Sequence, residues 1–227
     1  MKNNSVRTCC TVSAVAIAIF VLSLAAMPGT LYAQNAGELA AQANQFYMKG
    51  DLQKAIDAYT RAISADSESA RLYYNRGNVY YDAGNMDAAV KDYSKAIEFA
   101  PDLSQAYFNR ANAYYSQANY EQAAADYSHL VQAGEKDPAL YVNRGVAYYG
   151  QGAYDKARAD FDTALGLQGE NSTTLYYRGT ASYRLGSFRQ AVSDFEKAIT
   201  LDQNNVPAMY NLGVSYVRLA ETLKGTQ

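Results

Sequence analysis

The chain has 227 residues, 49% of them hydrophobic, and is therefore long enough to bury one sizeable core. Its 20 basic and 22 acidic residues give a formal net charge of −2. Phosphates are bound by clustered Lys and Arg, and the sequence shows no concentrated basic patch. We therefore expect no nucleic acid as a partner.

Residues 1–33 have the pattern of a secretory signal peptide. Lys2 and Arg7 form a charged start, residues 12–26 form an apolar run, and the segment ends in Leu-Tyr-Ala. We expect cleavage before Gln34, with export to the periplasm or secretion from the cell. No stable membrane insertion is expected after this cleavage.

Two alternatives for this segment stay open. Cleavage after Ala26 or Gly29 is one, because Leu31 is larger than the residue usually found three positions before the cut. An uncleaved anchor is the other, although residues 11–26 are shorter than the ~20 apolar residues of a typical span. The two cysteines both lie in this segment, so cleavage would leave a chain without disulfides.

A period of 34 residues runs through the rest of the chain. We number the positions of each copy from 1 to 34, starting at residues 36, 70, 104, 138 and 172. In the second copy, positions 4, 8, 11, 15, 20, 24 and 27 hold Tyr73, Gly77, Tyr80, Gly84, Ala89, Tyr93 and Ala96. Similar residues recur at these positions in every copy. Such a period indicates a repeat architecture, in which neighbouring units stack to bury apolar faces that no single unit can bury.

Each copy is predicted to form two helices. Positions 4, 8 and 11 share one face of the first helix, and positions 20, 24 and 27 share one face of the second. A small residue at position 8 lets another helix approach closely. Glycine at position 15, as at Gly50, Gly84, Gly152 and Gly186, suits the left-handed residue that ends a helix.

On these residues the chain resembles the tetratricopeptide repeat (TPR) family over residues 36–205. The resemblance implies an all-α fold, a right-handed α-solenoid of five TPR helix–turn–helix repeats plus a C-terminal capping helix. The expected repeats are residues 36–69, 70–103, 104–137, 138–171 and 172–205. Residues 206–227 would form the capping helix and tail, with Arg218, Glu221 and Lys224 as its polar side chains.

The resemblance places the first helices along a concave groove, and positions 5, 9 and 12 turn toward it. Tyrosine there offers a large contact area and one hydroxyl, which suits recognition of protein chains. The candidate partner-binding residues are Asn44, Tyr47, Tyr74, Asn78, Tyr81, Phe108, Asn112, Tyr115, Tyr149, Tyr176 and Tyr183. Packing between repeats is the alternative role for these side chains.

A second regularity joins positions 7 and 23. Four copies have Arg at position 7 and Asp at position 23, whereas the first copy lacks both. This co-occurrence predicts four bridges inside single repeats, because a planar guanidinium meets a carboxylate through two hydrogen bonds. The pairs are Arg76–Asp92, Arg110–Asp126, Arg144–Asp160 and Arg178–Asp194. A row of arginines that binds an anionic ligand is the alternative.

The sequence shows no catalytic motif, phosphate-binding loop or metal-binding spacing, so we expect no enzyme activity, cofactor or metal. The single histidine, His129, is expected to be an exposed helix residue. We therefore expect a non-enzymatic interaction scaffold or adaptor of the cell envelope. Its partner would be a protein, bound as an extended peptide or an amphipathic helix. Binding of a glycan or cell-wall fragment in the same groove is the alternative.

Overall fold

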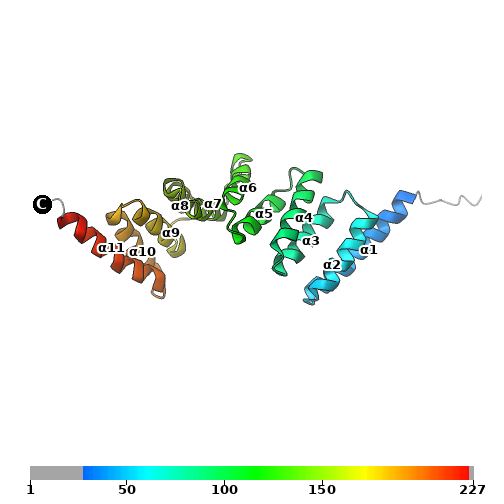
Figure 1. Ribbon diagram of the computed structural model, residues 1–227, viewed down its shortest axis with the longest axis horizontal. Helices are drawn as coiled ribbons and strands as arrows, with labels where there is room; N and C mark the ends of the chain where they lie inside the picture. The colour runs from blue at the N-terminus through cyan, green and yellow to red at the C-terminus, as the bar shows by residue number, and fades with distance from the viewer. Residues whose placement is uncertain (1–27, 225–227) are drawn as a thin grey trace, which may run out of the picture.

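The computed structural model describes residues 28–224 as eleven α-helices, with no β-strand among these residues. Figure 1 shows the helices following one another along the long axis of the molecule, from α1 at one end to α11 at the other. The helices are α1 (Pro28–Met48), α2 (Leu52–Ala65), α3 (Ala70–Asp82), α4 (Met86–Phe99), α5 (Ser104–Ser116), α6 (Tyr120–Gln132), α7 (Pro138–Gly150), α8 (Tyr154–Gln168), α9 (Ser172–Arg184), α10 (Phe188–Leu201) and α11 (Val206–Lys224). The predicted all-α solenoid is confirmed.

The helices from α3 to α10 form four pairs, and each pair lies inside one of the 34-residue ranges. The first pair differs, because α1 begins at Pro28 rather than near residue 36 and so includes Gln34. The rest of the predicted signal peptide, residues 1–27, lies outside the described residues. None of the helices between residues 28 and 224 is long and apolar enough to cross a membrane.

One aromatic side chain of the second helix forms the centre of each repeat. These position-24 residues are all 2% exposed or less: Tyr59, Tyr93, Tyr127, Phe161 and Phe195. They lie against position 8 of the first helix. A Cβ added to Gly77, Gly145 or Gly179 would come within 2.7–2.8 Å of a ring carbon, which is closer than real side chains approach. Glycine at position 8 therefore lets the aromatic ring lie directly on the backbone of the first helix.

The four predicted Arg–Asp bridges are all present, and each is bidentate. The distances from Nε to Oδ2 and from Nη2 to Oδ1 are 2.7 and 2.8 Å in Arg76–Asp92, 2.8 and 2.7 Å in Arg110–Asp126, 2.8 and 2.7 Å in Arg144–Asp160, and 3.0 and 2.6 Å in Arg178–Asp194. All four aspartates are buried. The guanidinium groups are thus held inside the fold, where each carboxylate neutralises the positive charge and accepts one hydrogen bond from Nε and one from Nη2.

Each of these arginines also reaches the preceding repeat, which the sequence analysis did not anticipate. The remaining nitrogen, Nη1, donates to position 25 of the previous second helix. The acceptors are Thr60 at 2.9 Å, Ser94 at 3.0 Å, Ser128 at 3.3 Å and Asp162 at 2.7 Å. Because one side chain contacts two successive second helices, we call this unit the arginine clamp. It fixes the geometry within a hairpin and between neighbouring hairpins.

The turn between the two helices of a repeat needs a left-handed residue. Gly50, Gly84, Gly152 and Gly186 have φ between 74° and 79° there, as predicted from position 15. The third repeat has alanine at this position, and Ala118 adopts φ 58°. Left-handed backbone costs an L-residue about 1–2 kcal/mol, so this turn holds strain that the other four lack.

Replacing Ala118 by glycine is expected to raise the free energy of unfolding by about 1 kcal/mol, because the relief of strain exceeds the added entropy of the unfolded chain. Urea denaturation of the purified protein measures the change. Gly84→Ala is the matched control and should lower the free energy of unfolding by a similar amount. A Cβ at residue 84 meets no atom within 4 Å, so only the backbone strain changes. Equal stabilities for all three proteins would contradict this account.

Candidate partner-binding groove

Two hollows lie along the surface formed by the first helices, one in each half of the array. The first, which we call the polar hollow, has a volume of about 250 Å³ and is lined by Tyr47, Asn78, Tyr81, Asp82, Tyr93, Asn109 and Asn112. The second, the aromatic hollow, has a volume of about 510 Å³. It is lined by Tyr115, Tyr120, Val146, Tyr149, Gly150, Tyr154, Phe161, Tyr176, Tyr177, Thr180 and Arg184.

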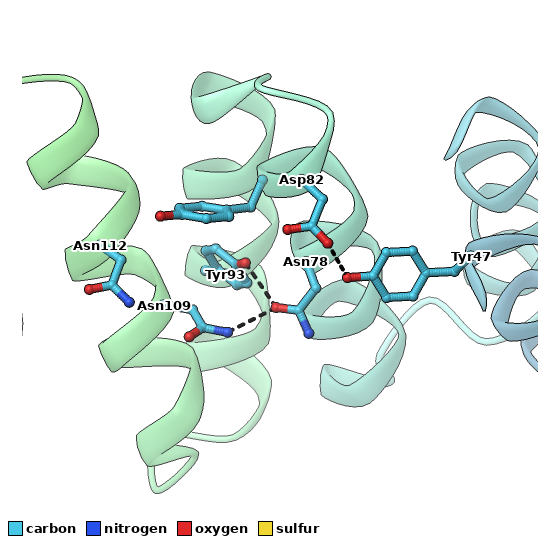
Figure 2. A pocket seen from close by; sticks show the side chains of 7 residues that line it. Tyr47, Asn78, Asp82, Tyr93, Asn109 and Asn112 are labelled. Carbon is cyan, nitrogen blue, oxygen red and sulfur yellow. Dashed lines mark hydrogen bonds between the residues drawn. The ribbon is translucent and has the colours of Figure 1, made fainter. Parts of the chain in front are cut away.

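Asparagine side chains in and near the polar hollow hold the buried tyrosines of the core. Figure 2 shows the Tyr93 hydroxyl donating to Oδ1 of Asn78 at 2.9 Å, and Nδ2 of Asn109 donating to the same oxygen at 2.9 Å. The hydroxyls of the other two core tyrosines donate in the same way. Tyr59 bonds Asn44, and Tyr127 bonds Asn112. The side-chain oxygen of each asparagine at position 9 therefore accepts a hydrogen bond from the core tyrosine of its own repeat.

This pairing explains a difference between the repeats that the sequence analysis did not connect. The three repeats with Tyr at position 24 have Asn at position 9. The two repeats with Phe at position 24, which has no hydroxyl to satisfy, have Val146 and Thr180 there. A buried hydroxyl without a partner is costly, so the amide and the hydroxyl occur together. The signal was visible in the sequence as a correlation between two positions.

Asp82 gives the polar hollow its negative charge. Its carboxylate accepts a hydrogen bond from the Tyr47 hydroxyl of the preceding repeat, as Figure 2 shows. Burial, together with this hydrogen bond to Asp82, raises the pKa of the Tyr47 phenol to about 12. Tyr47 is consequently a neutral donor near neutral pH. Among the described residues, no Lys or Arg forms an ion pair with Asp82.

Rings at positions 12 and 17 form a pair in each of the last three repeats, and the first two of these pairs line the aromatic hollow. The ring centroids are 5.4 Å apart in Tyr115–Tyr120, 5.1 Å in Tyr149–Tyr154 and 5.4 Å in Tyr183–Phe188. Tyr120 also lies on the backbone of α7, where a Cβ at Gly150 would come within 2.7 Å of its ring. In the first two repeats position 17 is Leu or Met, so only the C-terminal half of the array has these pairs.

Arg184 gives the aromatic hollow its positive charge. Its guanidinium carbon lies 4.6 Å from the centroid of the Tyr154 ring and 6.0 Å from that of Tyr149. Such cation–π contacts hold the guanidinium beside the two rings, where it also forms a hydrogen bond with the Tyr149 side chain. Within the part of the chain that the structure describes, no carboxylate pairs with Arg184. An anion in the aromatic hollow would therefore meet a positioned guanidinium.

The structure distributes the eleven predicted groove residues over several places. Tyr47, Asn78, Tyr81 and Asn112 line the polar hollow, and Tyr115, Tyr149 and Tyr176 line the aromatic hollow. Tyr183 lies with Tyr149 in a third hollow beside α11, and Asn44 lines a separate one near the start of the array. Tyr74 and Phe108 pack on the core rings of Tyr93 and Tyr127, with centroids 6.0 and 5.8 Å apart.

The sequence analysis missed residues that give the two hollows their charge and depth. These are Asp82, Asn109, Tyr120, Tyr154, Tyr177 and Arg184. Asp82 and Arg184 share position 13, which is Met, Asp, Ser, Gly and Arg in the five copies. A search for recurring residues passes over such a position. In the sequence, only the variation of position 13 among otherwise similar repeats could have indicated that it has a role in the groove.

His129 is an exposed helix residue, as predicted. Its ring stacks on Tyr107 with centroids 4.0 Å apart. Between residues 28 and 224 the structure contains no group of three His, Cys, Asp or Glu side chains that could hold a metal ion.

Comparison with family models agrees with this architecture. A model described as "TPR repeat" matches residues 43–84 and 77–118, and two described as "Tetratricopeptide repeat" match residues 108–172 and 172–205. The matches follow one another without a gap from residue 43 to residue 205. The chain belongs to the TPR family. A comparison with curated proteins gave no match.

Solved structures with the same fold include other TPR proteins. MamA from Desulfovibrio magneticus RS-1, described as residues 41 to the end, has a TM-score of 0.71 at 18% identity, over 76% of this chain and 97% of that one. YrrB, described as "a TPR protein with an unusual peptide-binding site", has a TM-score of 0.71 at 18% identity, over 80% of this chain and 97% of that one. Another MamA structure has a TM-score of 0.68 at 21% identity, over 71% of this chain and 94% of that one. At these identities the likeness shows the fold alone.

The pairing of Asn112 with Tyr127 predicts strongly non-additive substitutions. Asn112→Val is expected to lower the free energy of unfolding by about 1–3 kcal/mol, because it leaves the buried hydroxyl without an acceptor. Combining it with Tyr127→Phe reproduces the Val and Phe of the fourth repeat and should restore most of that loss. Chemical denaturation of the two single variants and the double variant measures the coupling. Additive losses would contradict the assignment.

High pH provides a second test of the same pair. Burial raises the pKa of the Tyr127 phenol above its ordinary value of 10.0. The folded protein then retains a proton that the unfolded chain loses, so this contribution to stability is complete below about pH 10 and falls as the pH rises further. The double variant lacks the phenol and should lose less stability above about pH 10 than the unaltered protein does.

Proposed function

We propose that this protein is an exported scaffold of the cell envelope that holds an extended segment of a partner protein across the polar and aromatic hollows. The TPR fold supports an interaction role, because its stacked helices present a long continuous surface. The likeness to YrrB, which is described as having an unusual peptide-binding site, agrees with a peptide as the bound form. The observation that carries the proposal is the aromatic hollow with Arg184 in its lining, a guanidinium that forms no ion pair with any described carboxylate.

The charges of the groove define the chemistry of the segment. Arg184 in the C-terminal half favours a carboxylate, while the surrounding tyrosines accept an apolar or aromatic side chain. Asp82 in the N-terminal half favours a basic or amide side chain. The segment would therefore carry an acidic and an aromatic residue together at one end, and a basic or polar residue toward the other. This polarity also sets the direction in which the segment lies.

Selection from a phage library of random dodecapeptides tests this chemistry. The unaltered protein should enrich peptides that place Asp or Glu beside an aromatic residue. Arg184→Glu should abolish that preference and lower the affinity for the enriched peptides at least roughly tenfold, because a charge pair becomes a repulsion. Fluorescence anisotropy with one enriched peptide measures the change.

Arg189→Glu is the matched control, since Arg189 is exposed on α10 and lines neither hollow. It should leave the affinity unchanged. Equal losses in both variants, or the same enriched peptides from both, would contradict the assignment of Arg184. Soluble polysaccharides and wall fragments are titrated in parallel. Saturable binding of these that Tyr149→Ser removes, without any peptide selection, would favour the glycan alternative.

Export is the part of the proposal that rests on residues 1–33. The charged start, apolar run and small residue before Gln34 support it. Mass spectrometry of the protein recovered from producing cells should find a chain that begins at Gln34 and lies outside the cytoplasmic fraction. An intact N-terminus in a membrane fraction would indicate the anchor instead.

A further inference from the structure

Helix α11 is the last helix that the structure describes, and its outer surface differs from that of the polar cap expected from the sequence. One face packs on α10, with Ala208 and Ser215 buried. The opposite face is exposed and apolar. It consists of Val206, Met209, Tyr210, Gly213, Val217 and Ala220, which we call the terminal stripe. Its large side chains are 42–73% exposed, and Lys224, on the same face, is its first charged neighbour along the helix.

In every complete repeat, the corresponding face of the first helix packs against the second helix of that repeat. When the 34-residue numbering is continued into α11, Gly213 is at position 8, equivalent to Gly77, Gly145 and Gly179. At those three glycines an aromatic ring lies within 3 Å of where a Cβ would be, whereas nothing lies within 4 Å of Gly213. The surface that binds an antiparallel helix in the other repeats is therefore present on α11, where no residue between 28 and 224 covers it.

The sequence of α11 is self-complementary about Gly213. Three residues to either side are Tyr210 and Tyr216, four residues to either side are Met209 and Val217, and seven residues to either side are Val206 and Ala220. A two-fold axis through an antiparallel helix pair brings residues at equal distances from its centre to the same level. At every such level of the terminal stripe, an apolar residue would meet another apolar residue.

We propose that the terminal stripe is a homodimer interface, in which α11 of a second copy packs antiparallel across Gly213 and takes the position that the second helix has in the complete repeats. The two glycines lie at the crossing point, where the absence of side chains lets the backbones approach closely. Tyr210 then lies beside Val217 of the second copy on one side of the seam, and Met209 lies beside Tyr216 of the second copy on the other. The Tyr216 hydroxyl already donates to Glu196, which leaves its ring free to pack.

The length of the terminal stripe limits the affinity expected for the dimer. Fifteen helical residues span roughly 22 Å, and one helix face of that length buries less than the ~800 Å² per partner of a standard interface. The dimer should accordingly be weak, with a dissociation constant on the order of 10–100 µM. The two arrays would point away from a shared centre, so both copies of the aromatic hollow belong to one particle.

Sedimentation equilibrium of the protein, in the processed form that producing cells make, tests the interface at about 5–500 µM. A reversible monomer–dimer equilibrium is expected. Val217→Lys should weaken it at least roughly tenfold, because at two places in the apolar seam an ammonium group would then lose its water beside Tyr210 of the other copy. Gly213→Leu should weaken it similarly, although a Cβ at this residue has no described atom of its own chain within 4 Å. Leu167→Lys is the matched control, since Leu167 is 46% exposed on α8 and should not affect association.

A photo-reactive phenylalanine analogue at residue 210 gives an independent readout. It should cross-link to the region around Val217 of a second copy, as peptide mapping of the product would show. Circular dichroism checks that each variant is folded. A monomer at all concentrations, a dimer unaffected by Val217→Lys, or cross-links to another helix would overturn the proposal. Binding of the monomer to anionic vesicles, lost in Val217→Lys, would assign the terminal stripe to a membrane surface and would also overturn it.

Discussion

The arginine clamp is the interaction on which the rest of the structure depends. A guanidinium taken out of water is tolerated only when its donors are met by acceptors of the right geometry. Here the aspartate of the same hairpin takes two hydrogen bonds, and a side chain of the preceding hairpin takes a third. One charged group therefore fixes both the angle within a repeat and the step to the next. Tyrosines above and below the guanidinium complete its enclosure in three of the four repeats.

The groove shows how a repeat scaffold divides its residues between stability and recognition. The position-9 asparagines face the groove, yet their carbonyl oxygens hold the core tyrosines. Recognition therefore depends on positions that the core does not use, and position 13 is the clearest of these. It carries a carboxylate at Asp82 and a guanidinium at Arg184, with Gly150 between them making room for the Tyr120 ring. The fold is constant along the array, while the charge of its surface changes from one end to the other.

The structural features that the sequence alone predicted are those that recur in successive repeats. The helix pairs, the left-handed glycines and the four Arg–Asp bridges each repeat every 34 residues, so a single physical argument covers several copies at once. It did not predict contacts between copies, such as the bond from Arg110 to Ser94, because spacing within one copy contains no information about its neighbour's orientation. Nor did it predict the charges of the hollows, which come from single residues at a variable position.

The apolar outer face of α11 was missed because Arg218, Glu221 and Lys224 suggested a polar helix. Arg218 and Glu221 pair with each other, and the face that contains Gly213 remains apolar.

The four clamps are not chemically equal. Three of them end on a hydroxyl of the preceding repeat, whereas Arg178 ends on the carboxylate of Asp162, whose side chain is 55% exposed. Attraction between a guanidinium and a solvent-accessible carboxylate is screened by salt, while a bond to a neutral hydroxyl is much less affected. The interface between the fourth and fifth hairpins is thus the one whose stability responds most to ionic strength. Fraying of the array in concentrated salt would begin there and release the last hairpin together with α11 as a unit, leaving the four hairpins before it stacked.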